Sequence, residues 1–381
     1  MTDSPDHLLK KIKGCLYGGA IGDAMGGVAE WRMPAEIRER YGYITDLVEA
    51  WDSPNDKSGR GDGRYTDDSH MVQLLSRCYI EHGGHLDAHE YFRRIGPMIG
   101  YEQRWIPDRG REMPLAERLF YPEKWLFIRW LANADPRYAG VGNMVNCGAA
   151  MYAAPIGIVN ACDPLRAYQE AVDVLSPHQV SFGLEAAAVQ AACVAEAFKP
   201  EASVSSIIDA ALSVAKDGTA DCIAAIAEKA STLTDWREAI APLREVMREY
   251  DTSADDAKSE RGNGTDDWTP SRSHSIEEVP IALGFLVVTG GDYEETIFGA
   301  TNYGRDNDSI AGMGGAIAGA LHGIDALRPE WVDTINSANR IDLMPMAAAL
   351  ADLTRKLQAE QLAAAQARQT DFEALTSPPS Q

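Results

Sequence analysis

The sequence predicts an all-α fold with long loops, and two observations carry that prediction. Alanine and glycine are abundant, whereas the alternation of β-branched residues that is typical of strands is scarce. Apolar residues recur at helical spacing instead, as Met71, Leu74 and Cys78 do at positions i, i+3 and i+7. The chain has 381 residues, 45% of them hydrophobic, so it is long enough to bury a large core.

The expected helices are defined by this spacing and by residues typical of helix ends. The first enters a Gly-rich stretch, and the second follows Thr66, which stands where an N-cap residue would. The helix that starts at Ser309 follows an acidic turn and is rich in glycine and alanine. In chain order, the expected helices cover residues 8–31, 68–82, 164–175, 180–198, 205–216, 220–230, 236–250, 279–289, 294–303, 309–321 and 344–368.

Two polar loops interrupt this pattern, at residues 44–65 and 251–275, and the second is expected to be mobile. The second loop could mark a domain boundary. However, the helices that follow it carry half of the candidate site described below, so we predict a single domain over residues 1–369. The tail, residues 370–381, is expected to be frayed and flexible.

The net charge and the cysteines limit the classes of function. The formal net charge is -22, which repels phosphate groups, so binding to nucleic acid or to an anionic membrane is not expected. None of the six cysteines forms a CxxC pair, which predicts buried thiols in a reduced compartment and no disulfide frame or zinc site. The N-terminus lacks a signal-peptide core and no apolar run reaches ~18 residues, so a cytoplasmic protein is predicted.

Two acidic clusters stand at the starts of expected helices, Thr66-Asp67-Asp68 and Asp306-Asn307-Asp308-Ser309. Consecutive side chains at a helix start diverge by roughly 100°, so Asp67 and Asp68 can face different ions, or one ion and a water. Oxygen ligands without His or Cys favour magnesium, manganese or calcium over zinc. The calcium loop of an EF-hand does not fit, because Ile310 and Ala311 stand where it needs an oxygen ligand and a glycine.

Each cluster alone has a simpler explanation. Acidic residues at helix starts are common caps and partners of the helix dipole. A similar motif, Thr265-Asp266-Asp267, lies in the second polar loop and shows how often so short a pattern arises. The metal-site interpretation therefore depends on the other motifs that accompany the two clusters.

From residue 14 to residue 323, the chain resembles the ADP-ribosylglycohydrolase family. Residues 14–30 are similar to the family's opening helix, with its Gly-Asp pair and a Glu shortly after. The two acidic clusters match the family's TDD-S/T and G-x-D-x-D-S/T motifs. The other matching segments, in chain order, are NCGAAMYAAPIGI, SPHQVSFGLEAAAVQAACVA and VPIALGFLV.

The resemblance implies an orthogonal multi-helix bundle, in agreement with the all-α prediction, and two magnesium ions between the clusters, with manganese as the alternative ion. Glu30 matches a Glu on a movable N-terminal loop of the family and is expected to act as general acid or base. Asp67 or a metal-bound water is the rival base, and a solvated Glu after a helix end is the simpler explanation for Glu30. The implied metal ligands are Thr66, Asp67, Asp68, Asp306, Asp308 and Ser309.

The resemblance also implies a ligand-binding side. The Gly-rich loop at 140–148 is expected to offer backbone N–H groups to a pyrophosphate. His178 matches a position near the adenosine half, although a hydrogen-bonded histidine at a helix start explains it equally well. Tyr303 could stack on a base, and core packing is an equally good explanation. The expected substrate-binding residues are Gly142, Asn143, Asn146, Cys147, Gly148, Tyr152, His178 and Tyr303.

The predicted activity is hydrolysis of a ribosyl C1″ bond through an oxocarbenium-like transition state, most directly the removal of ADP-ribose from a protein side chain. Cys147, Tyr152 and Pro177 depart from the family's motifs on the ligand side, so a small N-ribosylated or NAD-derived compound is an alternative substrate. A non-catalytic ADP-ribose-binding or structural role predicts lost metal ligands, and a calcium-binding regulatory role predicts an EF-hand; neither pattern is present. The sequence leaves the oligomeric state open.

Overall fold

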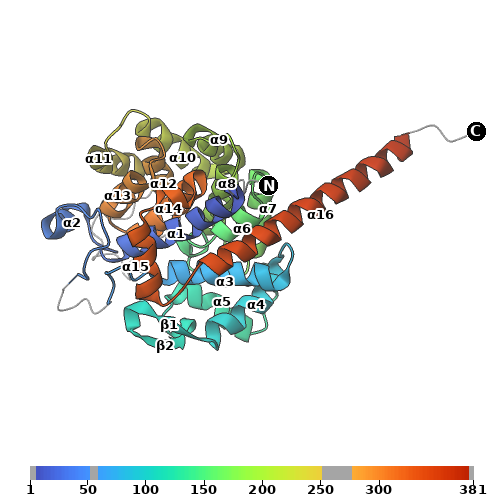
Figure 1. Ribbon diagram of the computed structural model, residues 1–381, viewed down its shortest axis with the longest axis horizontal. Coiled ribbons are helices and arrows are strands. Elements are labelled where there is room, and N and C mark those ends of the chain that lie inside the picture. Colours follow the sequence, from blue (N-terminus) through green and yellow to red (C-terminus); the bar gives the residue numbers. More distant parts are fainter. Residues whose placement is uncertain (1–5, 52–58, 251–276, 377–381) are drawn as a thin grey trace, which may run out of the picture.

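The computed structural model describes residues 6–51, 59–250 and 277–376. Over these residues the all-α prediction is confirmed, with α-helices α1 to α16 and one antiparallel hairpin of β1 (Gln103–Ile106) and β2 (Arg111–Pro114) (Figure 1). Part of the first polar loop, the second polar loop and the motif Thr265-Asp266-Asp267 lie outside the described residues. Within the described ranges, no helix is both long enough and apolar enough to cross a bilayer.

Two helices from opposite ends of the chain, α1 (His7–Gly27) and α14 (Asn307–His322), run side by side through the centre of the molecule (Figure 1). One face of α1 carries a glycine at every fourth position. A Cβ added at Gly22 would come within 2.1 Å of the carbonyl oxygen of Ala311, and one at Gly18 within 2.5 Å of that of Gly315. The two backbones therefore touch, and only glycine fits at these positions of α1.

The other helices cover this central pair on several sides (Figure 1). On one side lie α9 (Val204–Val214), α10 (Asp217–Ala230), α11 (Trp236–Met247), α12 (Glu278–Val288) and α13 (Tyr293–Tyr303). On the opposite side lie the hairpin with α3 (Asp67–His82), α4 (Ala88–Gly100) and α5 (Tyr121–Leu131). The remaining helices are α2 (Pro34–Tyr41), α6 (Ala154–Val159), α7 (Pro164–Leu175), α8 (Ser181–Ala197), α15 (Pro329–Asn339) and α16 (Met344–Thr376).

The hairpin and five of the helices, α2, α4, α5, α6 and α15, are not expected from the sequence. α4 shows why, because Pro97 lies in its interior and a proline there argues against a helix. Tyr91 and Ile95 of α4 are nevertheless fully buried. Burial of one apolar face against the rest of the molecule has therefore outweighed an unfavourable local sequence.

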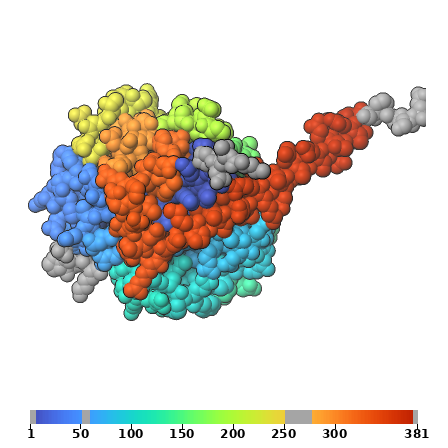
Figure 2. All heavy atoms as spheres, viewed as in Figure 1, coloured from blue at the N-terminus to red at the C-terminus, as the bar shows by residue number. Residues whose placement is uncertain are grey.

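The ends of three expected helices also differ. α1 ends at Gly27, so Glu30 lies in a turn and not in the helix, and α14 begins at Asn307, two residues before the expected start. α16 continues to Thr376, where a frayed tail was expected from residue 370. Alanine and glutamine are good helix formers and dominate residues 358–369, directly before this tail. Leu357 is the last buried residue of α16, which beyond it projects away from the body (Figures 1 and 2).

The contact between α1 and α14 makes a direct prediction about stability. We expect Gly22→Val to lower the free energy of unfolding by at least about 3 kcal/mol, because the backbone of Ala311 leaves no room for a side chain. The measurement is chemical denaturation of the full chain. The matched control is Gly314→Ala on α14, whose added Cβ would meet no atom closer than 3.4 Å and should be neutral or stabilising by up to about 1 kcal/mol. Equal midpoints for Gly22→Val and the unmodified chain would contradict the expectation.

Candidate active site

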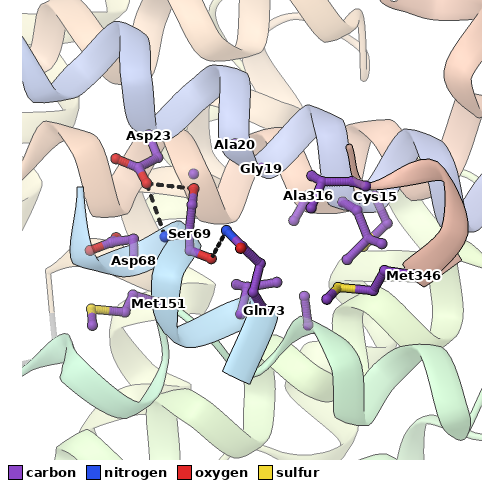
Figure 3. A pocket seen from close by; sticks show the side chains of 15 residues that line it. Cys15, Gly19, Ala20, Asp23, Asp68, Ser69, Gln73, Met151, Ala316 and Met346 are labelled. Carbon is purple, nitrogen blue, oxygen red and sulfur yellow. Dashed lines mark hydrogen bonds between the residues drawn. The ribbon is translucent and has the colours of Figure 1, made fainter. Parts of the chain in front are cut away.

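The first acidic cluster is held at the N-terminus of α3 by a carboxylate from α1. Thr66 is the N-cap, and its hydroxyl accepts the N–H of Asp68 at 3.4 Å. Asp23 accepts the N–H of Thr66 at 2.9 Å. It also accepts both the N–H and the hydroxyl of Ser69, at 3.0 and 2.6 Å (Figure 3). This one carboxylate fixes the turn that carries Thr66, Asp67 and Asp68.

The second cluster begins α14 and meets the first directly. The hydroxyl of Ser309 donates to Asp68 at 2.9 Å, and the N–H of Ser309 donates to Asp308 at 3.0 Å. Asp68, Asp308 and Ser309 are all buried. The structure therefore brings together two motifs that are far apart in the sequence.

Glu30 joins these carboxylates from the turn after α1. Carboxylate oxygens of Glu30, Asp306 and Asp308 lie within 4.8 Å of one another. Two backbone hydrogen bonds of 2.6 and 2.8 Å connect residues 31–32 to Arg305 and hold the turn against the start of α14. Glu30 is thus positioned at the acidic cluster, where the sequence placed it.

Several buried carboxylates lie close together in this site, and their pKa values are raised as a result. Burial raises the pKa of Asp23 to about 7, and the nearby charge of Asp308 adds to this rise. Burial also raises the pKa of Asp68 well above its usual range, assisted by Asp308 and Asp23. The pKa of Asp67 is raised by burial, but the guanidinium of Arg118 opposes that rise. The site is therefore short of positive charge.

Two buried arginines partly compensate, and sequence reasoning missed both. Arg118 donates to Asp67 at 2.5 Å and lies 3.4 Å from a carboxylate oxygen of Asp108. Arg60 forms an ion pair with Glu30. Both arginines come from irregular polar segments, where nothing in the local sequence indicates a buried ion pair.

The side chains gathered at the starts of α3 and α14 are suited to binding a divalent cation. Carboxylate and hydroxyl oxygens from two helix N-termini converge in a buried volume, and mutual repulsion disfavours their charged forms. Hard oxygen donors of this kind suit magnesium, manganese or calcium. The side chains available to hold such ions are Thr66, Asp67, Asp68, Asp306, Asp308, Ser309 and Glu30.

A small cavity borders the first cluster (Figure 3). Asp23, Asp68, Ser69 and Gln73 contribute its polar wall, and Met151 belongs to the apolar remainder. Its volume of about 20 Å³ holds about one water. It is therefore too small for a sugar and does not serve as the substrate pocket.

Part of the predicted ligand loop reaches the acidic site. The side-chain oxygen of Asn146 accepts the N–H of Gly148 at 3.0 Å, and its amide donates to Glu123 at 3.0 Å. The thiol of Cys147 donates to Asp306 at 3.0 Å. The structure therefore brings Cys147 of this loop to the acidic cluster, but the N–H of Gly148 already has a partner within the loop.

The other loop residues have structural roles. Gly142 is exposed at a positive φ of 90°. The amide of Asn143 donates to the carbonyl oxygens of Pro122 and His178, at 2.9 and 2.8 Å. Asn143 therefore ties the loop to neighbouring segments, and its side-chain amide is already engaged.

Tyr152 and His178 form part of a buried polar chain. The hydroxyl of Tyr152 lies 2.7 Å from that of Tyr91 and 2.8 Å from Nδ1 of His178, and all three side chains have no exposed surface. Burial lowers the pKa of His178 to about 4, so its ring is neutral at pH 7. The structure places both predicted substrate residues beneath the surface.

Tyr303 is likewise in the core, and a base has no access to its ring. The residue has no exposed surface, its hydroxyl donates to Glu277 at 2.9 Å, and the guanidinium of Arg244 lies 4.9 Å from its ring centre. Of the two explanations that the sequence allowed, the structure supports core packing.

Asp23 and Glu123 also belong to the site, but the sequence did not identify either of them as a site residue. Burial raises the pKa of Glu123 to about 7, with a further contribution from Asp67. Asp23 had a usable signal, because a lone acid in an apolar, Gly-rich helix must find buried partners. Glu123 has no such signal, since an acid in the first turn of a helix is ordinary.

Comparison with known proteins identifies the family. The family model described as ADP-ribosylglycohydrolase matches residues 4–361. The chain belongs to the ADP-ribosylglycohydrolase family. It is therefore a glycosidase-type hydrolase, and the resemblance inferred from the motifs is confirmed. Metal ions serve this family, in keeping with the acidic groups gathered here.

Individual members of the family are distant relatives. The chain is 26% identical to ADP-ribosylhydrolase ARH3 of Danio rerio over 93% of this chain and 91% of that protein. It is 25% identical to ADP-ribosylarginine hydrolase Tri1 of Pseudomonas putida over 88% and 76% of the two chains. A solved ADP-ribosylglycohydrolase-related protein complex shares the fold, with a TM-score of 0.61, 17% identity and coverage of 92% and 99%.

The raised pKa values predict how stability depends on pH. The pKa of Asp23 is about 7 in the folded chain against an ordinary value of 3.8, so the folded state binds more protons between these values. The free energy of unfolding without divalent ions should then fall as the pH rises from about 4 to about 7. Added magnesium should restore more stability at about pH 8 than at about pH 5, because it binds the ionised carboxylates.

Thermal denaturation at both pH values, in chelator and in magnesium, measures this effect. Asp23→Asn is the control and should flatten the decline seen in chelator. A magnesium-induced rise in melting temperature that is equal at both pH values would contradict the expectation.

Proposed function

We propose that this chain is a magnesium-dependent hydrolase that cleaves a ribosyl C1″ bond and removes ADP-ribose from a modified protein side chain. The observation that carries the proposal is the 2.9 Å hydrogen bond between Ser309 and Asp68, which makes one site of the two acidic clusters. The position of Glu30 beside Asp306 and Asp308 gives that site a further carboxylate.

The metal ligands we propose come from both helix starts. Two magnesium ions, with manganese as the alternative, would bind the ribose hydroxyls and lower the pKa of a bound water. The burial of the donors supports this assignment, as does the raised pKa of Asp68 among neighbouring carboxylates. The proposed ligands are Thr66, Asp67, Asp68, Asp306, Asp308 and Ser309.

We assign proton transfer to Glu30. Cleavage of the C1″ bond develops positive charge on the ribose, which the surrounding carboxylates stabilise. Glu30 would accept the proton of the water that attacks C1″, and its ion pair with Arg60 holds the side chain in place. Asp67, which Arg118 binds at 2.5 Å, remains the rival base.

The substrate class is supported by the names of two relatives, an ADP-ribosylhydrolase and an ADP-ribosylarginine hydrolase. The net charge of -22 disfavours a nucleic acid partner. A small N-ribosylated or NAD-derived compound is the second candidate. It is favoured by Cys147, which departs from the family's motif and whose thiol donates to Asp306 at 3.0 Å. The acidic residues that a non-catalytic member is expected to lack, Asp67, Asp68, Asp306 and Asp308, are all present in this chain.

The decisive experiment measures product release from a panel of arginine-linked, serine-linked and small-molecule-linked ADP-ribose, with magnesium and with chelator. We expect ADP-ribose release from a modified protein that chelator abolishes. Glu30→Gln should lower kcat by on the order of a hundredfold or more, because a proton-transfer group is lost.

Asp308→Asn should abolish turnover and magnesium binding together. The matched control is Asp325→Asn, an acid whose side chain is 69% exposed and paired with Lys10, which should leave the rate unchanged. Full activity in chelator would contradict the metal requirement. Turnover of small ribosides alone would replace the protein substrate by the second candidate.

A further inference from the structure

One face of α16 packs on the body of the molecule and can be followed along the helix to Gln361. Leu357 of this face is buried, and the amide of Gln358 donates to the carbonyl oxygen of Ala161 at 3.2 Å. One turn further, the amide nitrogen of Gln361 lies 2.8 Å from Nε2 of His85. Beyond this point the helix projects away from the body, and the residues that continue the same face are exposed (Figures 1 and 2).

This face stays apolar after the helix has left the body. Helical positions three or four residues apart share a face, so Gln361 is followed on it by Ala365 and, two turns later, by Phe372. Leu362 and Leu375 lie on either side of this line. Leu362, Phe372 and Leu375 are 61%, 65% and 80% exposed. Large apolar side chains that continue a packed face of a helix are typical of an interface.

The acids of the projecting segment lie away from this face. Consecutive helical residues are rotated by roughly 100°, so Asp371 and Glu373 point away from the line of Phe372 on its two sides, as Glu360 does. A chain with a net charge of -22 repels its own copy. A face without acids, on a helix held away from the body, is therefore a place where two copies can approach each other.

The charges of the segment are complementary to those of a second copy when the two helices run antiparallel. With Ala364 of one copy facing Ala364 of the other, Arg368 of each helix lies beside Glu360 of the second copy. The same register places Arg355, which is 46% exposed although it also pairs within the chain, beside Glu373 of the second copy. Both pairs are centred on residue 364, and a parallel pair of helices would place like charges opposite each other instead.

We propose that residues 358–376 form a dimerisation helix, which pairs antiparallel with the same segment of a second copy of this chain. The arrangement has two-fold symmetry, so each copy contributes the same apolar face. The two acidic bodies lie at opposite ends of the helix pair, which limits the repulsion between them. The dimer is independent of the proposed function, since no residue of the acidic site takes part in it.

Sedimentation equilibrium of the full chain tests the proposal, in salt of about 0.15 M to screen the repulsion between the bodies. We expect a reversible dimer. Leu362→Ser and Phe372→Ser should each raise the dimer dissociation constant by about tenfold or more, because apolar contact is lost on both copies. The matched control is Leu165→Ser on α7, where a leucine that is 56% exposed lies far from this helix in the sequence and should leave the dissociation constant unchanged.

A charge exchange tests the direction of the pair. Glu360→Lys and Arg368→Glu should each weaken the dimer severalfold, and the double variant should regain most of the loss, because the two residues meet only across an antiparallel interface. Equal melting temperatures would show that these variants are folded. A double variant weaker than either single one would overturn the antiparallel pair. A chain that stays monomeric at every concentration, or a dimer that Leu362→Ser and Phe372→Ser leave intact, would overturn the dimerisation helix and leave this face to a partner of another kind.

Discussion

The close approach of α1 and α14 is the constraint on which the site depends. Backbone meets backbone at Gly18 and Gly22, so neither helix can shift along or away from the other without losing the contact. At one end of this pair, the turn that carries Glu30 is hydrogen-bonded to Arg305, just before α14. Asp23 of α1 then fixes the start of α3. Packing of small residues thereby sets the relative positions of three acidic segments.

The electrostatic cost of this arrangement explains the arginines around it. Burial and mutual repulsion raise the pKa values of Asp23 and Asp68, so the site tends to take up protons or cations. Arg118 pairs with Asp67, and Arg60 pairs with Glu30. The pKa values of Asp23 and Asp68 remain raised even so, and a bound divalent ion would supply the positive charge that their ionised forms lack.

The sequence predicted features that depend on a short stretch of residues. It did not predict contacts between segments that are far apart in the chain. The starts of α3 and α14 were predicted because a polar, acidic stretch precedes an apolar helical pattern in each, whereas the metal-ligand roles of their residues were implied by the family resemblance. The roles of Asp23, Arg118 and Glu123 depend on segments that meet only in the folded chain. Tyr152, His178 and Tyr303 were expected near a ligand and are fully buried, because sequence does not distinguish a buried polar side chain from one on a binding surface. α4 was missed because tertiary burial overrode Pro97.

The central claim is that the helix pair gathers the two acidic clusters into one divalent-ion site. It is tested most directly by diffraction from crystals grown with Mn²⁺, which has an anomalous signal and can replace Mg²⁺ at oxygen sites. The account predicts anomalous peaks between Asp67 and Asp68 on one side and Asp306 and Asp308 on the other. Peaks elsewhere on the surface, with none between these carboxylates, would contradict it.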